Sequence, residues 1–191
     1  MPWLSDSISV VMILTLGVPL SRFAKVIIEL AFLPFFLLTW LTAFTDLVYK
    51  KDQKLILIIV LVLGIAFEIA FFYIIFTDFS LLGTFESELD IIWSPFILIY
   101  LFSFLAIFVT TGIVFGRESF KSDNKEIRTK GKFLITAFLS FMFGVILDAS
   151  VPLEPIWVVI TRLILISSAF EYYFGFILPE WMKKLLKTSK A

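Results

Sequence analysis

The sequence of 191 residues contains neither cysteine nor histidine. Without cysteine the chain can form no disulfide, no thiolate metal site and no thiolate nucleophile. Without histidine it lacks the commonest metal ligand and a general base suited to neutral pH. Basic and acidic residues number 16 each, so the basic excess of a nucleic-acid-binding protein is also missing. We therefore expect no cofactor, no bound metal and no nucleic-acid partner.

Motifs that carry catalysis are missing as well. The sequence has no HExxH motif of zinc proteases, no GxGD motif of intramembrane aspartyl proteases and no glycine-rich phosphate-binding loop. A serine and histidine couple is excluded because histidine is absent. We therefore expect a protein that is not an enzyme.

What the sequence does contain is long apolar runs. Hydrophobic residues make up 60% of the chain and the mean hydropathy is +1.03, whereas a soluble domain is close to half apolar. A helix needs about 20 residues to cross about 30 Å of hydrocarbon. Runs near this length cover residues 26–49, 55–76, 91–115, 133–150 and 156–178. The sequence thus predicts an all-α bundle of five or six transmembrane helices with short loops, forming one membrane domain over residues 1–191.

The sixth candidate span is the run over residues 3–20, whose one charge is Asp6. It lacks the basic start and the small-residue cleavage site of a signal peptide, so we expect it to be retained. Its length is sufficient for crossing, but crossing would leave Arg22 and Lys25 on the outer side. The alternative is a helix that lies along the interface, and both alternatives stay open.

Basic residues gather in alternate connections, which orients the chain because lysine and arginine near span ends stay in the cytoplasm. Three lie in residues 50–54, six in residues 117–132 and four in the tail, residues 179–191. The connections over residues 77–90 and 148–155 contain acidic residues but no lysine or arginine. We expect a multi-pass protein of the cell membrane, in contact with the lipid bilayer, with a cytoplasmic C-terminus.

The longest basic connection has the start signal of a helix. Asp123 followed by Glu126 matches a capping residue and its partner three positions on, so the fourth long helix should begin near Asn124. It would then project into the cytoplasm before entering the bilayer at Phe133. This stalk either only orients the chain, as a solvated charge run, or forms a docking surface for a membrane or cytoplasmic protein partner.

The tail mixes apolar and basic residues, which is typical of a segment lying on a membrane surface. Trp181 and Leu185 alternate with basic residues that attract anionic lipid. We expect contact with anionic lipid of the inner leaflet through Lys183, Lys184 and Lys187.

Charged residues inside apolar spans are costly and are functional hypotheses by default. At a rise of 1.5 Å per residue, Glu68 lies about 12 Å and Arg162 about 9 Å below the outer ends of their spans. We expect these two side chains to pair, with Glu29 joining them in the outer half of the bundle. The cluster is either an ion pair that fixes helix register or a site for a ligand or proton.

A second polar group is predicted in the inner half of the bundle. Its members are Thr42, Asp46, Ser167, Ser168 and Glu171. Small residues on one helix face more often serve packing than binding, so this group also has two interpretations. Pro34 permits a kink in the helix over residues 26–49, which either shapes a pocket or only bends the helix.

The basic loop from Asn124 to Gly131, set between short-looped helices, resembles the multi-span sensor modules that precede histidine kinases in archaea and bacteria. The chain departs from that pattern because no kinase or other output domain follows before Ala191. The resemblance implies a free-standing, non-enzymatic sensor or partner-binding membrane module with a basic cytoplasmic surface. The alternative is a small transporter or an ion or proton pathway through Glu29, Glu68 and Arg162.

Overall fold

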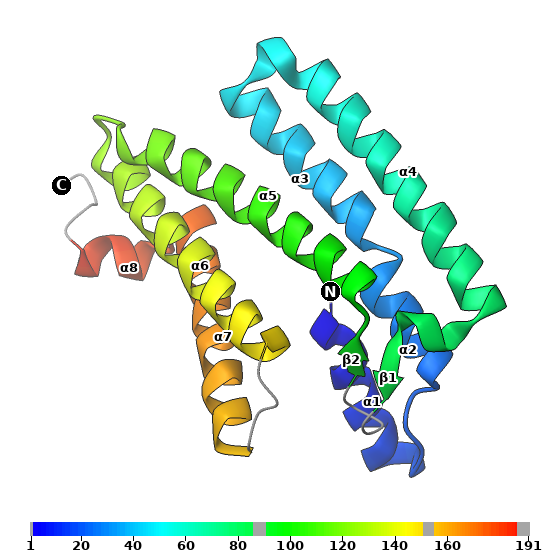
Figure 1. The fold of residues 1–191 in the computed structure, drawn as a ribbon. Coiled ribbons are helices and arrows are strands. Elements are labelled where there is room, and N and C mark those ends of the chain that lie inside the picture. The colour runs from blue at the N-terminus through cyan, green and yellow to red at the C-terminus, as the bar shows by residue number, and fades with distance from the viewer. Residues whose placement is uncertain (1, 86–90, 151–154, 187–191) are drawn as a thin grey trace. The chain divides into compact units, whose positions relative to one another are not determined.

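The protein is a bundle of α-helices, as the sequence predicted. A computed structural model describes residues 2–85, 91–150 and 155–186 (Figure 1). The helices are α1 Pro2–Leu16, α2 Arg22–Leu30, α3 Leu33–Val48, α4 Gln53–Thr77, α5 Pro95–Phe120, α6 Lys125–Ser150, α7 Pro155–Phe176 and α8 Glu180–Leu185. Two 3-10 turns, η1 Lys50–Asp52 and η2 Phe79–Leu82, and two short strands, β1 Gly83–Phe85 and β2 Ile91–Trp93, complete the described elements.

Five helical segments of the described chain are long and apolar enough to cross a membrane. They are Arg22–Val48, Lys50–Thr77, Pro95–Phe120, Lys125–Asp148 and Val159–Phe176. On α4, large apolar side chains such as Leu63 and Ile69 are more than half exposed, at 61% and 67%. Soluble proteins rarely expose contiguous apolar surface of this kind. By helix length and composition, the chain is therefore a multi-span membrane protein.

Helix α1 is the shorter apolar helix whose crossing the sequence left open. It has 15 residues, which corresponds to about 22 Å against the roughly 30 Å of hydrocarbon. It is not one of the five long segments found in the described chain. The helix lengths therefore support the five-span alternative.

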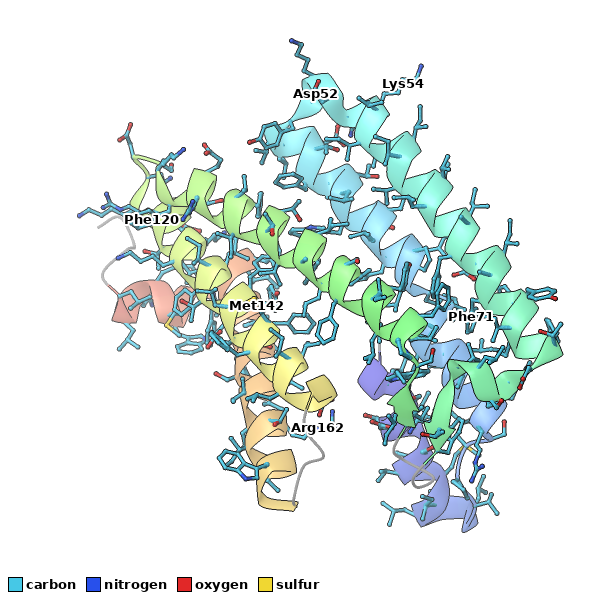
Figure 2. The ribbon with its side chains drawn as sticks, in the orientation of Figure 1. Asp52, Lys54, Phe71, Phe120, Met142 and Arg162 are labelled. Atoms are coloured by element: carbon cyan, nitrogen blue, oxygen red, sulfur yellow. The ribbon has the colours of Figure 1, made fainter. Side chains whose placement is uncertain are left out.

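The chain divides into two compact units, Met1–Phe104 and Leu105–Ala191, and α5 runs through both. The prediction that residues 1–191 form a single membrane domain stays a prediction. In the first unit α3 and α4 pack against each other as a helical hairpin closed by η1. Figure 2 labels Asp52 and Lys54 at this turn and Phe71, which is fully buried, in the other half of α4.

The helix over residues 26–49 is interrupted just before Pro34, where the sequence permits a kink. Helix α2 ends at Leu30 and α3 begins at Leu33, so Pro34 falls in the first turn of α3. Proline is tolerated there because the N–H it lacks would have no partner within the helix. Helix α2 also begins earlier than the predicted helix start at residue 26. It starts at Arg22, since the Ser21 hydroxyl caps it by accepting from the backbone N–H of Ala24.

A β-hairpin replaces the predicted beginning of the third long helix. Residues Ile91–Trp93 form β2, which pairs antiparallel with β1 so that Phe85 lies opposite Ile91. The predicted helix start at Ile91 is therefore wrong, and α5 begins at Pro95 and continues to Phe120. Apolar residues suit a strand as well as a helix, and proline at a first helical position marks the true start.

A buried core in the first unit is formed by α2, α3, α4, η2 and α5, and residues of the two strands pack against it. Its residues are Val26, Leu30, Leu33, Phe67, Phe71, Ile75, Leu82 and Ile97. Figure 1 shows α1, α2, β1 and β2 together at the end of α4 remote from η1. Because the basic turn at η1 is predicted to be cytoplasmic, this end of the first unit is the predicted outer end.

In the second unit α6 and α7 pack closely along each other. A Cβ atom built at Gly144 of α6 would lie 2.7 Å from Leu165 Cδ2 of α7. One built at Gly175 of α7 would lie 2.7 Å from Leu134 Cγ of α6. These contacts show that both helices use glycine where they approach most closely.

The fourth long helix begins where the sequence predicted, although with a different capping residue. Helix α6 starts at Lys125, and the Asn124 side-chain oxygen accepts from the backbone N–H of Glu126 at 2.8 Å. The predicted cap at Asp123 is therefore wrong by one residue. Asparagine serves equally well at this position, and the Glu126 side chain is free of a capping role because it forms ion pairs instead.

The predicted orientation can be tested with reporters that work on one side of the membrane. A reporter inserted near Asp123 or fused after Ala191 is expected to be cytoplasmic, because both sites adjoin the basic segments. One inserted near Glu88, which lies outside the described residues, is expected to be external. External labelling near Asp123 would overturn the orientation.

Candidate functional sites

A buried polar cluster joins α1 to α2 at the predicted outer end of the first unit. The Lys25 ammonium lies 2.8 Å from Asp6 Oδ1, and the Ser5 hydroxyl donates to Glu29 Oε1. Lys25 is 2% exposed and Glu29 is 5% exposed, whereas Asp6 is 27% exposed. A second contact of α1 comes from Ser9, whose buried hydroxyl accepts from the backbone N–H of Leu20 at 3.2 Å. Polar side chains therefore fasten α1 to the chain that follows it.

Contacts with aromatic rings place this cluster beside β1 and the C-terminal end of α4. The Arg22 guanidinium lies 4.9 Å from the ring centroid of Phe85 in β1. The rings of Phe23 and Phe76 are 6.2 Å apart, which places the start of α2 level with the end of α4. Arg22 and Lys25 thus lie toward the predicted outer end, although lysine and arginine near span ends usually stay on the cytoplasmic side. Lys25 is accommodated there because α1 folds back and supplies the carboxylate of Asp6.

Sequence reasoning named Glu29 but missed Ser5 and Asp6 as members of the same cluster. It treated the first apolar run as a candidate span and gave it no specific neighbour. The single charge in that run was the available signal, since an isolated carboxylate in an apolar helix requires a partner.

Arg162 has a partner that the sequence analysis did not name. Its Nη1 atom lies 3.5 Å from Asp148 Oδ2, so α6 and α7 are joined by an ion pair within the second unit. Glu68 belongs to the first unit, and its buried Oε1 atom has no hydrogen-bond partner in the described part of the chain. The pairing of Glu68 with Arg162, and the three-residue cluster with Glu29, stay predictions.

The residues of the second predicted group that lie on α7 form local bonds. The Ser167 hydroxyl donates to Glu171 Oε1 at 3.1 Å, one helical turn away. The Ser168 hydroxyl is buried and donates to the backbone carbonyl of Leu165 at 2.7 Å. Ser167 and Glu171 therefore lie on one face of α7, as their spacing predicted.

The two remaining members of that group lie on α3. The Thr42 hydroxyl donates to the carbonyl of Leu38 at 2.8 Å. Asp46 is half exposed and its Oδ1 atom lies 3.8 Å from the Lys50 ammonium. Thr42 and Asp46 belong to the first unit and the α7 residues to the second, so their grouping stays a prediction.

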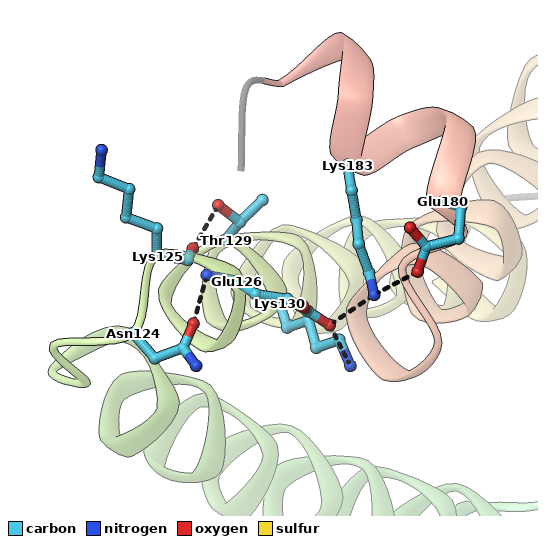
Figure 3. A network of polar contacts seen from close by, with 7 residues as sticks. All are labelled: Asn124, Lys125, Glu126, Thr129, Lys130, Glu180 and Lys183. Carbon is cyan, nitrogen blue, oxygen red and sulfur yellow. Dashed lines mark hydrogen bonds and ion pairs between the residues drawn. The ribbon is translucent and has the colours of Figure 1, made fainter. Parts of the chain in front are cut away.

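At the predicted inner end of the second unit, α8 is fastened to the first turn of α6 (Figure 3). The Lys183 ammonium lies 3.1 Å from Glu126 Oε1 and 2.8 Å from Glu180 Oε1. Lys130 adds a further ion pair with Glu126 at 3.4 Å. We call the contact of Lys183 with Glu126 the clasp. It joins two segments that the sequence analysis treated separately.

The clasp leaves Lys183 fully charged at physiological pH. Hydrogen bonds to Glu180 and to Glu126 raise the pKa of Lys183 above its ordinary value of 10.5. While Glu126 and Glu180 are ionised, its contribution to stability is therefore complete below that value and is lost as the pH rises through the raised pKa.

Apolar contacts accompany the clasp. Met182 is buried, and the ring of Trp181 meets that of Phe174 on α7 edge to face, with centroids 5.8 Å apart. Leu178, two residues after the end of α7, is buried and has a φ of 43°, a left-handed value that turns the chain sharply toward α8. The position of α8 on the second unit is therefore set by packing as well as by charge.

The arrangement defines a class of protein, a multi-span membrane protein with polar clusters near both predicted membrane surfaces. Within residues 2–85, 91–150 and 155–186, no group of three or more acidic side chains is placed to hold a metal ion. Comparison with protein-family models, with curated proteins and with solved structures finds no match to the chain.

Proposed function

We propose that this protein is a non-enzymatic sensor or partner-binding module of the cell membrane that acts through its cytoplasmic surface. The observation that supports this function best is the inner end of the second unit. There α6 extends about 12 Å beyond its apolar run, as eight residues at 1.5 Å each, and α8 docks on the extension. A solvated charge run that only orients the chain has no need of a docked helix.

Most of the side chains left exposed on this extension are basic, with Ile127 as the apolar exception. Lys125, Arg128 and Lys132 are exposed, whereas Glu126 is directed to the clasp. Positions 125, 128 and 132 share one helix face by their spacing. Such a face favours an acidic partner surface, because complementary charge steers association.

The experiment is purification of the full chain from its native membranes, followed by identification of copurifying proteins. The test variant carries Lys125→Gln, Arg128→Gln and Lys132→Gln. The matched control carries Lys50→Gln, Lys51→Gln and Lys54→Gln, which removes the same charge from the other basic turn. A partner should be retained by the control and lost from the test variant, and a C-terminal reporter should show that both keep their orientation. Equal retention by both variants would contradict a role for the α6 extension.

The lipid-facing part of the proposal concerns the tail. Basic side chains near the inner leaflet are each attracted by about 1 kcal/mol, which supports contact of the basic tail with anionic lipid through Lys184 and Lys187. Lys187 lies outside the described residues. Lys184 is exposed, whereas Lys183 is 18% exposed and engaged in the clasp.

A transporter or a proton pathway is the second candidate, and the state of Glu68 favours it. A buried carboxylate oxygen without a hydrogen-bond partner in the described chain is costly in hydrocarbon and is typical of a site that takes up a proton or ligand. The same purified protein, reconstituted in vesicles, separates the two functions. A sensor should show no ion or proton flux, whereas a pathway should show flux that Glu68→Gln abolishes.

A further inference from the structure

The basic residues of the tail lie in two different environments, and this points to two different roles. The inference rests on the proposed function at the inner leaflet. We propose that Lys183 is a positioning residue that holds α8 on α6, and that the anionic lipid surface is contacted by the opposite face of α8, through Trp181, Lys184 and Leu185. Lys183 itself does not bind lipid in this arrangement.

Helix geometry separates the two faces. At about 100° per residue, Lys184 and Leu185 lie within about 60° of Trp181, whereas Lys183 lies about 200° away. Exposure follows the same division, since Trp181 is 58% and Leu185 is 71% exposed while Lys183 is 18% exposed. The face that carries Lys183 therefore meets the protein. The face that carries Trp181 stays largely exposed, although the Trp181 ring meets Phe174 edge to face.

The open face has the chemistry of a membrane surface contact. A tryptophan and a leucine beside a lysine combine apolar area with positive charge, which suits the boundary between acyl chains and anionic headgroups. α8 follows α7 directly through Pro179, so it starts at the predicted inner end of a span. The lipid layer is therefore the occupant that the position and the charge of this face both favour.

The clasp is needed because α8 is short. Six residues do not form a stable helix alone, since helix initiation is unfavourable and few bonds follow it. A helix already held in place binds without a further loss of conformational entropy. Lys183 and Glu126 would thus increase lipid contact without touching lipid.

The experiment uses the full chain in lipid nanodiscs, and the absence of native cysteine allows single labels. A fluorophore on Leu185→Cys reports depth through quenching by a water-soluble quencher. Discs of neutral lipid are compared with discs containing anionic lipid. A second preparation, with spin labels at Arg128→Cys and Leu185→Cys, reports whether α8 remains docked on α6.

Three variants separate the roles. Lys183→Glu places a second carboxylate beside Glu126, and the repulsion should release α8. The distribution of distances between the two spin labels should broaden, and quenching of the fluorophore at residue 185 should rise several-fold. The exchange Lys183→Glu with Glu126→Lys keeps the net charge and should restore most of both signals. Lys184→Gln should leave the label distance unchanged and weaken the preference for anionic discs about five-fold, corresponding to about 1 kcal/mol per basic side chain at the surface.

The outcomes distinguish this inference from the proposed function. If the exchange restores docking but not lipid contact, Lys183 binds lipid directly and the division of roles is wrong. If Lys183→Glu leaves the label distance narrow, the clasp does not position α8. If the wild-type label is docked yet equally quenched in both kinds of disc, the clasp holds but the proposed contact with anionic lipid fails.

Discussion

Replacing Asp6 with leucine is expected to lower the free energy of unfolding by about 3–5 kcal/mol, because it strands the buried ammonium of Lys25. Lys25 is 2% exposed and lies 2.8 Å from Asp6, so water cannot replace the lost carboxylate without opening the contact between α1 and α2. The double variant Asp6→Leu with Lys25→Met should recover much of the loss, since both charges are then removed. Thermal unfolding of the detergent-solubilised protein measures the three variants.

The matched control is the ion pair of Asp46 with Lys50. Its atoms are 3.8 Å apart and the side chains are 49% and 79% exposed, so Asp46→Leu should cost less than about 1 kcal/mol. Equal effects of Asp6→Leu and Asp46→Leu would contradict a buried pair. Additive effects of the changes at Asp6 and Lys25 would show that the two charges do not interact.

The consequence for the fold is local to the first unit. The pair fastens α1 to α2, and Ser5 adds a hydrogen bond to Glu29 beside it. Asp6→Leu should therefore increase hydrogen exchange in α1 before it affects α4, which contributes no residue to the ion pair.

The membrane spans could be predicted because their signal is local. An apolar run of about 20 residues can satisfy its backbone in hydrocarbon only as a helix, so composition and length determine α4 and α6 directly. Basic residues at the ends of the runs predicted the orientation in the same way. The interruption just before Pro34 falls where the sequence permits a kink, because proline acts on its own helix.

Other features depend on contacts between residues distant in sequence. The pairing of Asp6 with Lys25 requires α1 to fold back, which an apolar run does not specify. The pairing of Arg162 with Asp148 requires α6 and α7 to be in register. The depth of the charges along their helices pointed to Glu68 as a partner of Arg162, and that pairing stays a prediction. Depth restricts which charges can meet but does not select among them.

The hairpin before α5 illustrates an ambiguity of short apolar segments. Ile91–Trp93 belongs to the same apolar run as the helix, and its own residues suit a strand as well as a helix, so that Pro95 is the signal that separates the two. The strand forms because β1 lies beside it and supplies backbone partners. Pairing of this kind is decided by the returning chain and not by the run itself.

Gly131→Ala is expected to destabilise the protein, because Gly131 lies where α6 packs against α5. A Cβ atom at Gly131 would lie 2.6 Å from the backbone nitrogen of Phe120 and 2.7 Å from the carbonyl oxygen of Gly116. Both obstacles are backbone atoms of α5, so the two helices must separate. We expect a loss of about 1–3 kcal/mol, which exceeds the gain of up to about 1 kcal/mol from the better helix propensity of alanine.

Gly144→Ala on the same helix is the control, because it adds the same methyl group and gains the same helix propensity. Its Cβ atom would lie 2.7 Å from Leu165 Cδ2 and 2.9 Å from Leu165 Cγ, which belong to a flexible side chain and not to the backbone. We therefore expect Gly144→Ala to change the free energy of unfolding by less than about 1 kcal/mol. The cost of the close contact is partly offset by the better helix propensity of alanine. Thermal unfolding of both variants in the same detergent measures the difference. A loss for Gly144→Ala equal to or larger than that for Gly131→Ala would show that α5 and α6 do not meet through their backbones.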